Sequence, residues 1–267
     1  MTDPTPVGRR SALVALGTVG LGSLLAACSG DAGGGTASAT TVARVPTTSG
    51  ASATVRPQAP TGAAAKALLG QATTCTVSTE LTEGPYYFDV DSIRSDLRED
   101  RQGTVLRLAM RVQRAGSCAP IGNALVDLWH CDADGVYSGF ERASLGGPGG
   151  PGPGGGRTDQ HTYLRGAQVT NADGVVEFTT IYPGWYRGRT THIHTKVHLD
   201  RRTMLTTQLF FDEAVNQAVY SGQPYARHPG RTTFNDSDGI FAHNQVVTAR
   251  RRGDAWLAAI NLSVQQT

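Results

Sequence analysis

Short stretches of alternating apolar and polar residues, separated by clusters of Gly, Pro, Asn and Asp, run through most of the chain after residue 100. Alternation with a period of two places apolar side chains on one face of a β-strand, and such clusters mark turns. Many short strands separated by turns are typical of sandwiches and barrels, so we expect an all-β fold: an antiparallel β-sandwich with short helices and long loops. The predicted strands are Thr104–Gln113, Ala124–Trp129, Gly174–Thr180, His192–Leu199, Leu205–Phe211, Val246–Arg250 and Trp256–Val264.

The part of the chain before these strands has a different composition. Residues 29–70 are nearly all Ala, Gly, Ser, Thr, Val and Pro, with almost no large apolar side chain. Such a stretch buries too little surface to offset its ordering entropy. We therefore expect a disordered linker over residues 28–70 and a sandwich domain over residues 71–267. The short helices are predicted at Ala64–Gln71, Asp91–Asp100 and Asp212–Val219.

The first residues have the pattern of an export signal. Arg9-Arg10 precedes an uncharged apolar run, Ala12 to Ala27, that is too short for a comfortable membrane span. We expect a signal peptide over residues 1–27, with the paired arginines favouring the twin-arginine route over the general one. The run ends Leu25-Ala26-Ala27-Cys28, which resembles a bacterial lipobox and implies a lipid on Cys28. The alternative is an ordinary signal with a chance cysteine.

These features predict an exported protein, either on the outer face of the cell membrane as a lipoprotein or secreted, with membrane contact through the lipid anchor only. The net charge of +2 comes without a dense run of Lys or Arg, which argues against a nucleic-acid partner. An oxidising compartment permits a disulfide among Cys75, Cys118 and Cys131, and the sequence leaves the pairing open. No C-x-x-C pair is present, so a zinc knuckle is not expected.

The pair His192 and His194 begins a predicted strand. Residues two apart on a strand point to the same face, so both imidazoles can reach one metal ion. His198 shares that face but lies farther along the strand, more than about 13 Å from His192. As a bare pattern this pair is more often a polar strand face than a metal site, so its meaning depends on its neighbours.

Two tyrosines precede the histidine pair at predicted turns. Pro183-Gly184 is a turn that directs Tyr186 back towards the strand, and Tyr137 follows the turn after Ala124–Trp129. A phenol has a pKa near 10 and binds as phenolate only to a strong Lewis acid. Two phenolates and two imidazoles would favour Fe(III), unlike the two-His, one-carboxylate set of Fe(II) oxygenases.

At these residues the chain resembles the intradiol ring-cleavage dioxygenases, in their secreted, lipoprotein-type branch. The likeness covers roughly residues 75–245, and its motifs are specific together although each alone is weak. It includes Thr82-Glu83-Gly84-Pro85-Tyr86-Tyr87 near the domain start. The other matching pieces, in family order, are Val126–His130, Gly135–Ser138, Asp173-Gly174, Pro183–Tyr186, Arg189 and His192–His194.

The resemblance implies one mononuclear Fe(III) held by Tyr137, Tyr186, His192 and His194. It implies that a catechol-type diol displaces Tyr186, which acts catalytically. With O2, the ring then opens to a cis,cis-muconate-type diacid.

The resemblance also implies a catalytic Arg189 that stabilises negative charge on the substrate, and Gln208 lining the same pocket. Pro85 and Tyr86 are expected to approach the site and contact substrate; the alternative for them is a turn and a core aromatic. The chain departs from the family in two places. The segment between Tyr186 and His192 is shorter than in the protocatechuate enzymes, and the helical dimerisation region of the catechol enzymes is missing.

Other functions remain open at this point. One is a non-catalytic, surface-anchored binding module for aromatics or polysaccharide, which would have no need for iron. Another is a cupin-like or copper protein, although the cupin pattern places a Glu a few residues after the pair, where Lys196–Asp200 stand here. We expect His130 to hydrogen-bond nearby backbone rather than bind metal, and Trp129 and Trp185 to be core or pocket-wall residues. The choice among catechol, protocatechuate, hydroxyquinol and larger catechols is not predicted.

Overall fold

The computed structural model describes residues 43–46, 52–55, 62–71, 75–90, 92–148, 156–200 and 202–265. The predicted signal peptide, Cys28 and most of the predicted linker lie outside these residues. Within the linker, β1 (Ala43–Pro46) pairs with β2 (Ser52–Val55) in an antiparallel hairpin. In the part of the chain that is described, no helix has both the length and the apolar character needed to cross a bilayer.

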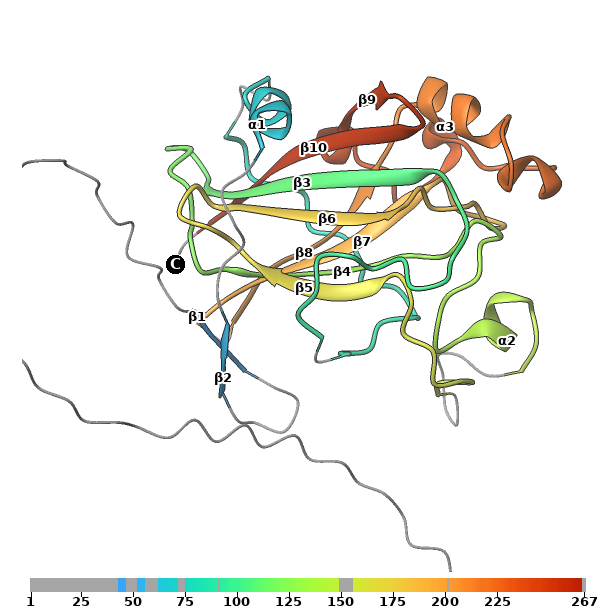
Figure 1. Ribbon diagram of the computed structural model, residues 1–267, viewed down its shortest axis with the longest axis horizontal. Coiled ribbons are helices and arrows are strands. Elements are labelled where there is room, and N and C mark those ends of the chain that lie inside the picture. The colour runs from blue at the N-terminus through green and yellow to red at the C-terminus, as the bar shows by residue number, and fades with distance from the viewer. Residues whose placement is uncertain are drawn as a thin grey trace, which may run out of the picture. The chain divides into compact units, whose positions relative to one another are not determined.

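Two four-stranded sheets form a β-sandwich, which confirms the predicted fold class (Figure 1). The strand orders are β6-β3-β10-β9 and β5-β4-β7-β8. One pairing departs from the antiparallel prediction, because β10 runs parallel to β3. The strands are β3 (Val105–Arg114), β4 (Leu125–Trp129), β5 (Arg165–Val169), β6 (Val175–Ile181), β7 (His192–Leu199), β8 (Arg202–Phe210), β9 (Thr248–Arg252) and β10 (Ala255–Val264).

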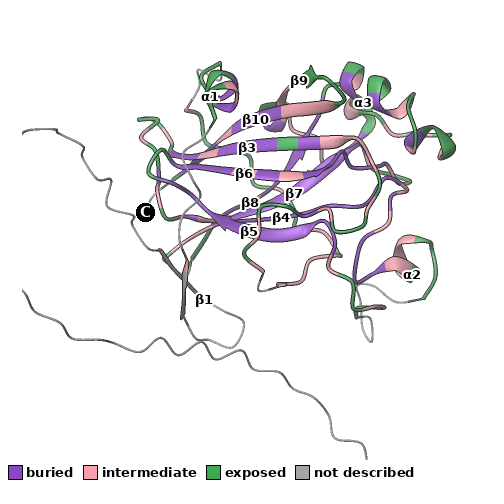
Figure 2. Cartoon of the chain, in the orientation of Figure 1, coloured by how far each residue is buried: buried purple, intermediate pink, exposed green. Residues whose placement is uncertain are grey.

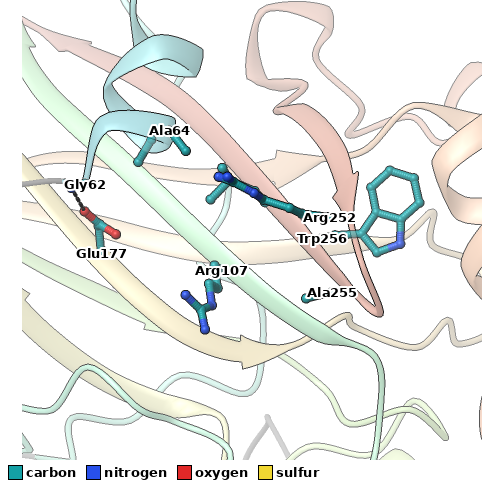
Figure 3. Close-up of a pocket in the computed structure, with 9 residues that line it drawn as sticks. Gly62, Ala64, Arg107, Glu177, Arg252, Ala255 and Trp256 are labelled. Atoms are coloured by element: carbon teal, nitrogen blue, oxygen red, sulfur yellow. Dashed lines mark hydrogen bonds between the residues drawn. The ribbon is translucent and has the colours of Figure 1, made fainter.

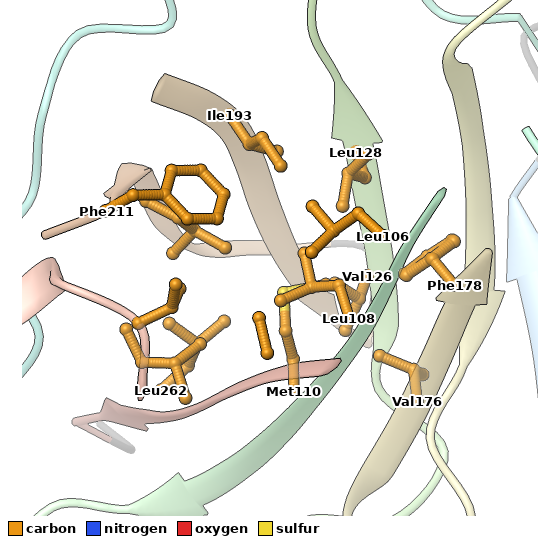
Figure 4. Close-up of a cluster of buried hydrophobic side chains, with 14 of the residues drawn as sticks. Leu106, Leu108, Met110, Val126, Leu128, Val176, Phe178, Ile193, Phe211 and Leu262 are labelled. Carbon is orange, nitrogen blue, oxygen red and sulfur yellow. The ribbon is translucent and has the colours of Figure 1, made fainter. Parts of the chain in front are cut away.

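The main core fills the space between the two sheets (Figure 4). Alternate residues of β3, such as Leu106 and Leu108, are fully buried there, and Ile193 and Val197 of β7 face them from the other sheet. Each such side chain stabilises the fold by roughly 1.5–3 kcal/mol through burial. Strands β3, β4, β5, β6 and β7 are accordingly buried along most of their length in Figure 2, whereas β9 at the edge of its sheet is not. Because Ile193 points into the core, His192 and His194 must point to the opposite face of their sheet.

Helix α1 (Ala63–Leu69) lies at the predicted position and packs on the sheet that contains β3 and β10. Its Leu68 and Leu69 are buried against Ala109 and Ala259. The packed part of the chain therefore extends upstream of the boundary expected at residue 71. Helix α3 (Glu213–Tyr220) confirms the helix predicted at Asp212–Val219. Further short elements are α2 (Glu141–Ser144) and three 3-10 turns, η1 (Tyr225–Arg227), η2 (Asn235–Ser237) and η3 (His243–Gln245).

A cavity of about 350 Å³ lies where α1 meets the sheet that contains β3 and β10 (Figure 3). Its walls come from α1, β3, β6, β9 and β10, whereas the histidine pair belongs to β7 of the other sheet. The cavity is thus separate from the predicted metal site. Its lining residues are Gly62, Ala64, Ala65, Arg107, Glu177, Arg252, Ala255, Trp256 and Leu257.

The helix predicted over Asp91–Asp100 is wrong. Asp91 lies outside the described residues, and residues 92–100 run as an irregular strap along the edges of β5 and β6. The Arg94 amide donates to the Ala167 carbonyl and the Leu97 amide to the Thr179 carbonyl. Leu97 is fully buried. Long-range pairing and this buried leucine outweigh the local helical tendency. Strand β5, with the sequence Arg-Gly-Ala-Gln-Val, was also not predicted, because it shows no alternation.

The structure resolves the cysteine pairing that the sequence left open. Cys75 and Cys118 form a disulfide, with their Cα atoms 5.3 Å apart. Cys131 is free and buried. The disulfide joins the segment before the sandwich to the turn that follows β3 and so fixes the entry of the chain into the domain.

Candidate functional site

Two imidazoles and two phenols converge on the outer face of the sheet that contains β7. The Nε2 atoms of His192 and His194 are 3.1 Å apart, as expected for residues two apart on a strand. The hydroxyl of Tyr186 lies 3.0 Å from the His192 Nε2, and that of Tyr137 lies 3.4 Å from it. The structure therefore brings together all four side chains predicted to bind iron. Their role as metal ligands stays a prediction.

The histidine rings are held in two different ways. His192 donates its Nδ1 proton to the carbonyl of Thr190 at 2.7 Å, which leaves the Nε2 lone pair free to bind a metal. His194 stacks on Trp129, with ring centroids 5.0 Å apart and planes within 8°. On another side of His194 lies Gly84, whose φ is +71° and where a Cβ would approach the ring Cε1 to 3.0 Å. The predicted role of Trp129 as a wall residue is thus confirmed.

The two histidines and two tyrosines of this cluster are themselves uncharged at neutral pH. Burial lowers the pKa of His192 to about 3 and that of His194 well below its usual value, so both rings are neutral at pH 7. Burial, followed by the nearby Tyr186, raises the pKa of Tyr137, and burial raises that of Tyr186. Two neutral imidazoles and two phenols with raised pKa values fit a strongly Lewis-acidic cation, because such a cation would favour loss of the phenol protons. Fe(III), with its preference for anionic oxygen, meets this need.

The two turns that carry the tyrosines are locked together by glycines. The Gly184 amide donates to the Asp132 carbonyl at 2.9 Å. A Cβ on Gly184 would lie 2.4 Å from the carbonyl oxygen of Ala133, and a Cβ on Gly135 would lie 2.4 Å from that of Trp185. Only glycine permits this backbone approach. The distance between the two phenols therefore depends on the two glycines.

Arg189 and Gln208 meet beside the cluster, as the resemblance implied. Arg189 donates through Nη2 to the Gln208 side-chain carbonyl at 2.5 Å, and through Nε to Asp238 at 2.9 Å. Gln208 in turn donates to the carbonyl of Thr82 at 2.9 Å. A guanidinium held in this way is preorganised to stabilise an anion next to the four donors.

The segment Thr82–Tyr87 reaches the site through Gly84 and Tyr86. The Tyr86 ring lies 4.9 Å from the Tyr137 ring, whereas Pro85 is exposed at the surface beside it. His198 contacts Thr203 at 3.1 Å, away from the cluster, as its distance along the strand predicted. His130 donates through Nδ1 to the Cys131 carbonyl at 2.7 Å, and its Nε2 accepts from the Thr180 hydroxyl at 2.8 Å, which confirms its structural role.

Sequence reasoning missed several residues that shape the site. Gly84 stood in a recognised motif, but nothing local indicated that it touches His194. Thr190 acts through its backbone carbonyl, so its side-chain type gives no signal. Asp238 lies in the cluster Asn235–Gly239, whose composition is that of an ordinary turn. The contacts of all three are long-range or backbone-mediated.

Comparisons with known proteins agree with this geometry. A family model described as Dioxygenase matches residues 82–226, which is more than half of the chain. The structure is similar to the intradiol ring-cleavage dioxygenase from Tetranychus urticae, with 34% sequence identity and a TM-score of 0.67. That match covers 72% of this chain and 95% of the other.

Two further proteins are similar over smaller or more divergent regions. The dioxygenase domain of a dioxygenase carbohydrate-binding protein fusion from Streptomyces sp. SirexAA-E is 28% identical, with a TM-score of 0.52 over 72% of this chain and 99% of that one. Chlorocatechol 1,2-dioxygenase from Rhodococcus opacus is 32% identical over 135 residues, which are 43% of this chain and 47% of that protein. The chain thus spans about half the length of this curated relative.

Proposed function

We propose, from the premise that this chain belongs to the intradiol ring-cleavage dioxygenase family, that it is an Fe(III)-dependent enzyme acting on catechol-type diols. It would use O2 to cleave the ring between the two hydroxyl-bearing carbons and release a cis,cis-muconate-type diacid. The observation that carries this proposal is the convergence of two phenol oxygens and two imidazole Nε2 atoms. The Tyr137 and Tyr186 oxygens and the His194 Nε2 all lie within 3.4 Å of the His192 Nε2. The names of the relatives support the substrate class.

The ferric ion would be held by Tyr137, Tyr186, His192 and His194 as one mononuclear site. When bound, the ion would supply a Lewis acid that favours loss of the diol protons, and the ring of the resulting dianion is electron-rich enough to react with O2. The residues of the chain set the geometry in which this happens. Tyr137 is fully buried and His192 is fixed by Thr190, so these two donors have little freedom to move.

Tyr186 is the donor suited to leave and to take a proton. Its side chain is only partly buried, whereas Tyr137 is completely enclosed. Because burial raises the pKa of the Tyr186 phenol, its oxygen readily keeps a proton accepted from the incoming diol. Arg189 then stabilises negative charge that develops on the ring, and Gln208 keeps Arg189 in place.

The visible spectrum of the purified chain with ferric iron tests this proposal. We expect a red-brown tyrosinate-to-iron band that shifts when catechol is added without oxygen. Tyr137→Phe and Tyr186→Phe should each alter the band, because each removes one phenolate donor. Tyr163→Phe is the matched control, since its hydroxyl contacts Glu141 rather than the cluster, and it should leave the band unchanged. A colourless protein that binds no iron would instead support the surface-anchored binding module.

We also propose that the chain is exported and carries a lipid on Cys28 after removal of residues 1–27. The support is the apolar run behind Arg9-Arg10 and the lipobox-like Leu25–Cys28. Expressed in a bacterial host fed an alkyne-tagged fatty acid, the full chain should take up the tag and sediment with membranes. Cys28→Ala should lose the tag. A wild-type chain that remains untagged, or a Cys28→Ala chain that is still tagged, would contradict the lipid anchor.

A further inference from the structure

Asp238 is a buried carboxylate whose hydrogen bonds all lead to the candidate site or to its own turn. The residue is only 7% exposed. Its Oδ2 accepts from the Arg189 Nε at 2.9 Å and from the Thr190 amide at 2.8 Å, while its Oδ1 accepts from the Ile240 amide at 2.8 Å. Asp238 lies 49 positions after Arg189 and beyond residues 82–226, which the family model matches.

The contacts of Asp238 decide which part of Arg189 is left for a substrate. The guanidinium has three nitrogens, and two of them are engaged. Nε is bound by Asp238 and Nη2 by Gln208. Among the described residues, none accepts a hydrogen bond from Nη1. A guanidinium held at two of its nitrogens cannot rotate about its long axis, so the direction of Nη1 is fixed by Asp238 and Gln208 together.

The same carboxylate reaches a predicted iron ligand through the backbone. Asp238 accepts from the amide of Thr190, and the carbonyl of Thr190 accepts the Nδ1 proton of His192 at 2.7 Å. One buried oxygen therefore accepts hydrogen bonds from the arginine and from the amide of Thr190, the residue whose carbonyl orients the histidine ring. Outer groups of this kind orient metal ligands and adjacent charged groups in many metal sites.

We propose that Asp238 is a positioning residue that fixes Arg189 with Nη1 directed at the bound diol. Through its bond to Thr190, Asp238 also helps to hold the ring of His192 in place. The proposal rests on the proposed function. Burying a charged pair is costly unless further hydrogen bonds satisfy it, and here the Thr190 and Ile240 amides do so. Without the carboxylate, the guanidinium would be held by Gln208 alone and could rotate.

The first test reads the contact itself and needs neither iron nor turnover. In the full chain before iron is added, the Nε proton of Arg189 should give a slowly exchanging 15N NMR signal, identified by its loss in Arg189→Lys. Asp238→Asn should lose this signal because the charged acceptor is gone. Asp236→Asn is the matched control: it makes the same change at an exposed acid of the same turn, and it should keep the signal.

The second test reads the consequence for the reaction. With iron bound, Asp238→Asn should lower kcat/KM for catechol by about 10–100-fold, mainly through KM, while the tyrosinate-to-iron band changes little. Asp238→Glu, which keeps the charge, should recover part of the loss, and Asp236→Asn should match the wild type. Combined with Arg189→Lys, Asp238→Asn should add little further loss, because both changes remove the same arrangement.

Several outcomes would overturn the proposal. It fails if Asp238→Asn folds and keeps both the Arg189 signal and kcat/KM within about twofold, or if its loss adds fully to that of Arg189→Lys. If Asp238→Asn does not fold, the exchange rate of the Arg189 signal in the wild type decides, and fast exchange contradicts the contact. If the wild type has no catechol turnover, the proposed function fails, and the NMR result alone shows whether Asp238 holds Arg189.

Discussion

Replacing Gly135 by alanine is expected to abolish iron binding and to destabilise the domain by several kcal/mol. The residue has φ of +83°, a region that costs a residue with a Cβ about 1–2 kcal/mol. The larger effect is steric, because the new Cβ would lie 2.4 Å from the Trp185 carbonyl oxygen and 3.2 Å from the Tyr186 Cβ. Relief requires the two tyrosine-bearing turns to separate, which moves Tyr186 away from Tyr137.

Two further variants separate backbone strain from the clash. Gly116 has φ of +82° and nothing within 4 Å of a built Cβ, so Gly116→Ala should cost only the strain and keep full iron binding. Gly184→Ala has the clash, 2.4 Å from the Ala133 oxygen, without the positive φ, so it should also lose iron. Bound iron and urea unfolding measure the two effects. A Gly135→Ala chain that behaves like Gly116→Ala in both would show that the turns are not locked.

Asp127→Asn and His130→Gln are expected to change the pH dependence of stability in opposite directions. Burial lowers the pKa of His130 to about 4, below its unfolded value near 6.5. Its contribution to stability is therefore present above pH 6.5 and is lost as the pH falls towards 4. Burial raises the pKa of Asp127 to about 6, above its unfolded value near 3.8. Its contribution is present below pH 3.8 and is lost as the pH rises through 6.

Each effect is on the order of 3 kcal/mol, so the two should largely cancel between pH 4 and 6.5 in the wild type. Asp127→Asn should then lose more free energy of unfolding on acidification than the wild type, and His130→Gln should lose less. His192 and His194 are present in all three proteins, so their acid titration does not affect the comparison. Urea unfolding at pH 4.5, 5.5 and 6.5 measures the slopes. Parallel slopes for the three proteins would refute the assigned pKa shifts.

The sequence predicted those parts of the site that depend on local spacing. His192 and His194 share a face because a strand repeats every two residues, and that spacing needs no knowledge of the rest of the fold. The core followed for the same reason, since the alternation in β3 identifies its buried side chains. The family likeness identified Tyr137, Tyr186, Arg189 and Gln208, and the structure brings them together.

The failures came from contacts between distant segments. Residues 92–100 were expected to be helical, but they bond to the edges of β5 and β6, which lie more than 60 positions later in the chain. Gly84 and Asp238 look like turn residues, and their roles depend on His194 and Arg189 arriving next to them. A propensity or a motif cannot report a partner that only the completed fold supplies.

The parallel pairing of β3 with β10 has a consequence for synthesis of the protein. β10 lies between β3 and β9 in its sheet but is the last of these strands in the chain. This sheet therefore lacks one of its inner strands until β4 to β9 and finally β10 have been translated. The main core meanwhile lacks Ala258, Ile260, Leu262 and Val264, which β10 contributes. Contacts that close so late in the chain fold slowly and leave strand edges open to other chains. Productive folding must therefore wait until the ribosome has delivered residues 255–264, and a nascent chain that stalls before them is at risk of aggregation.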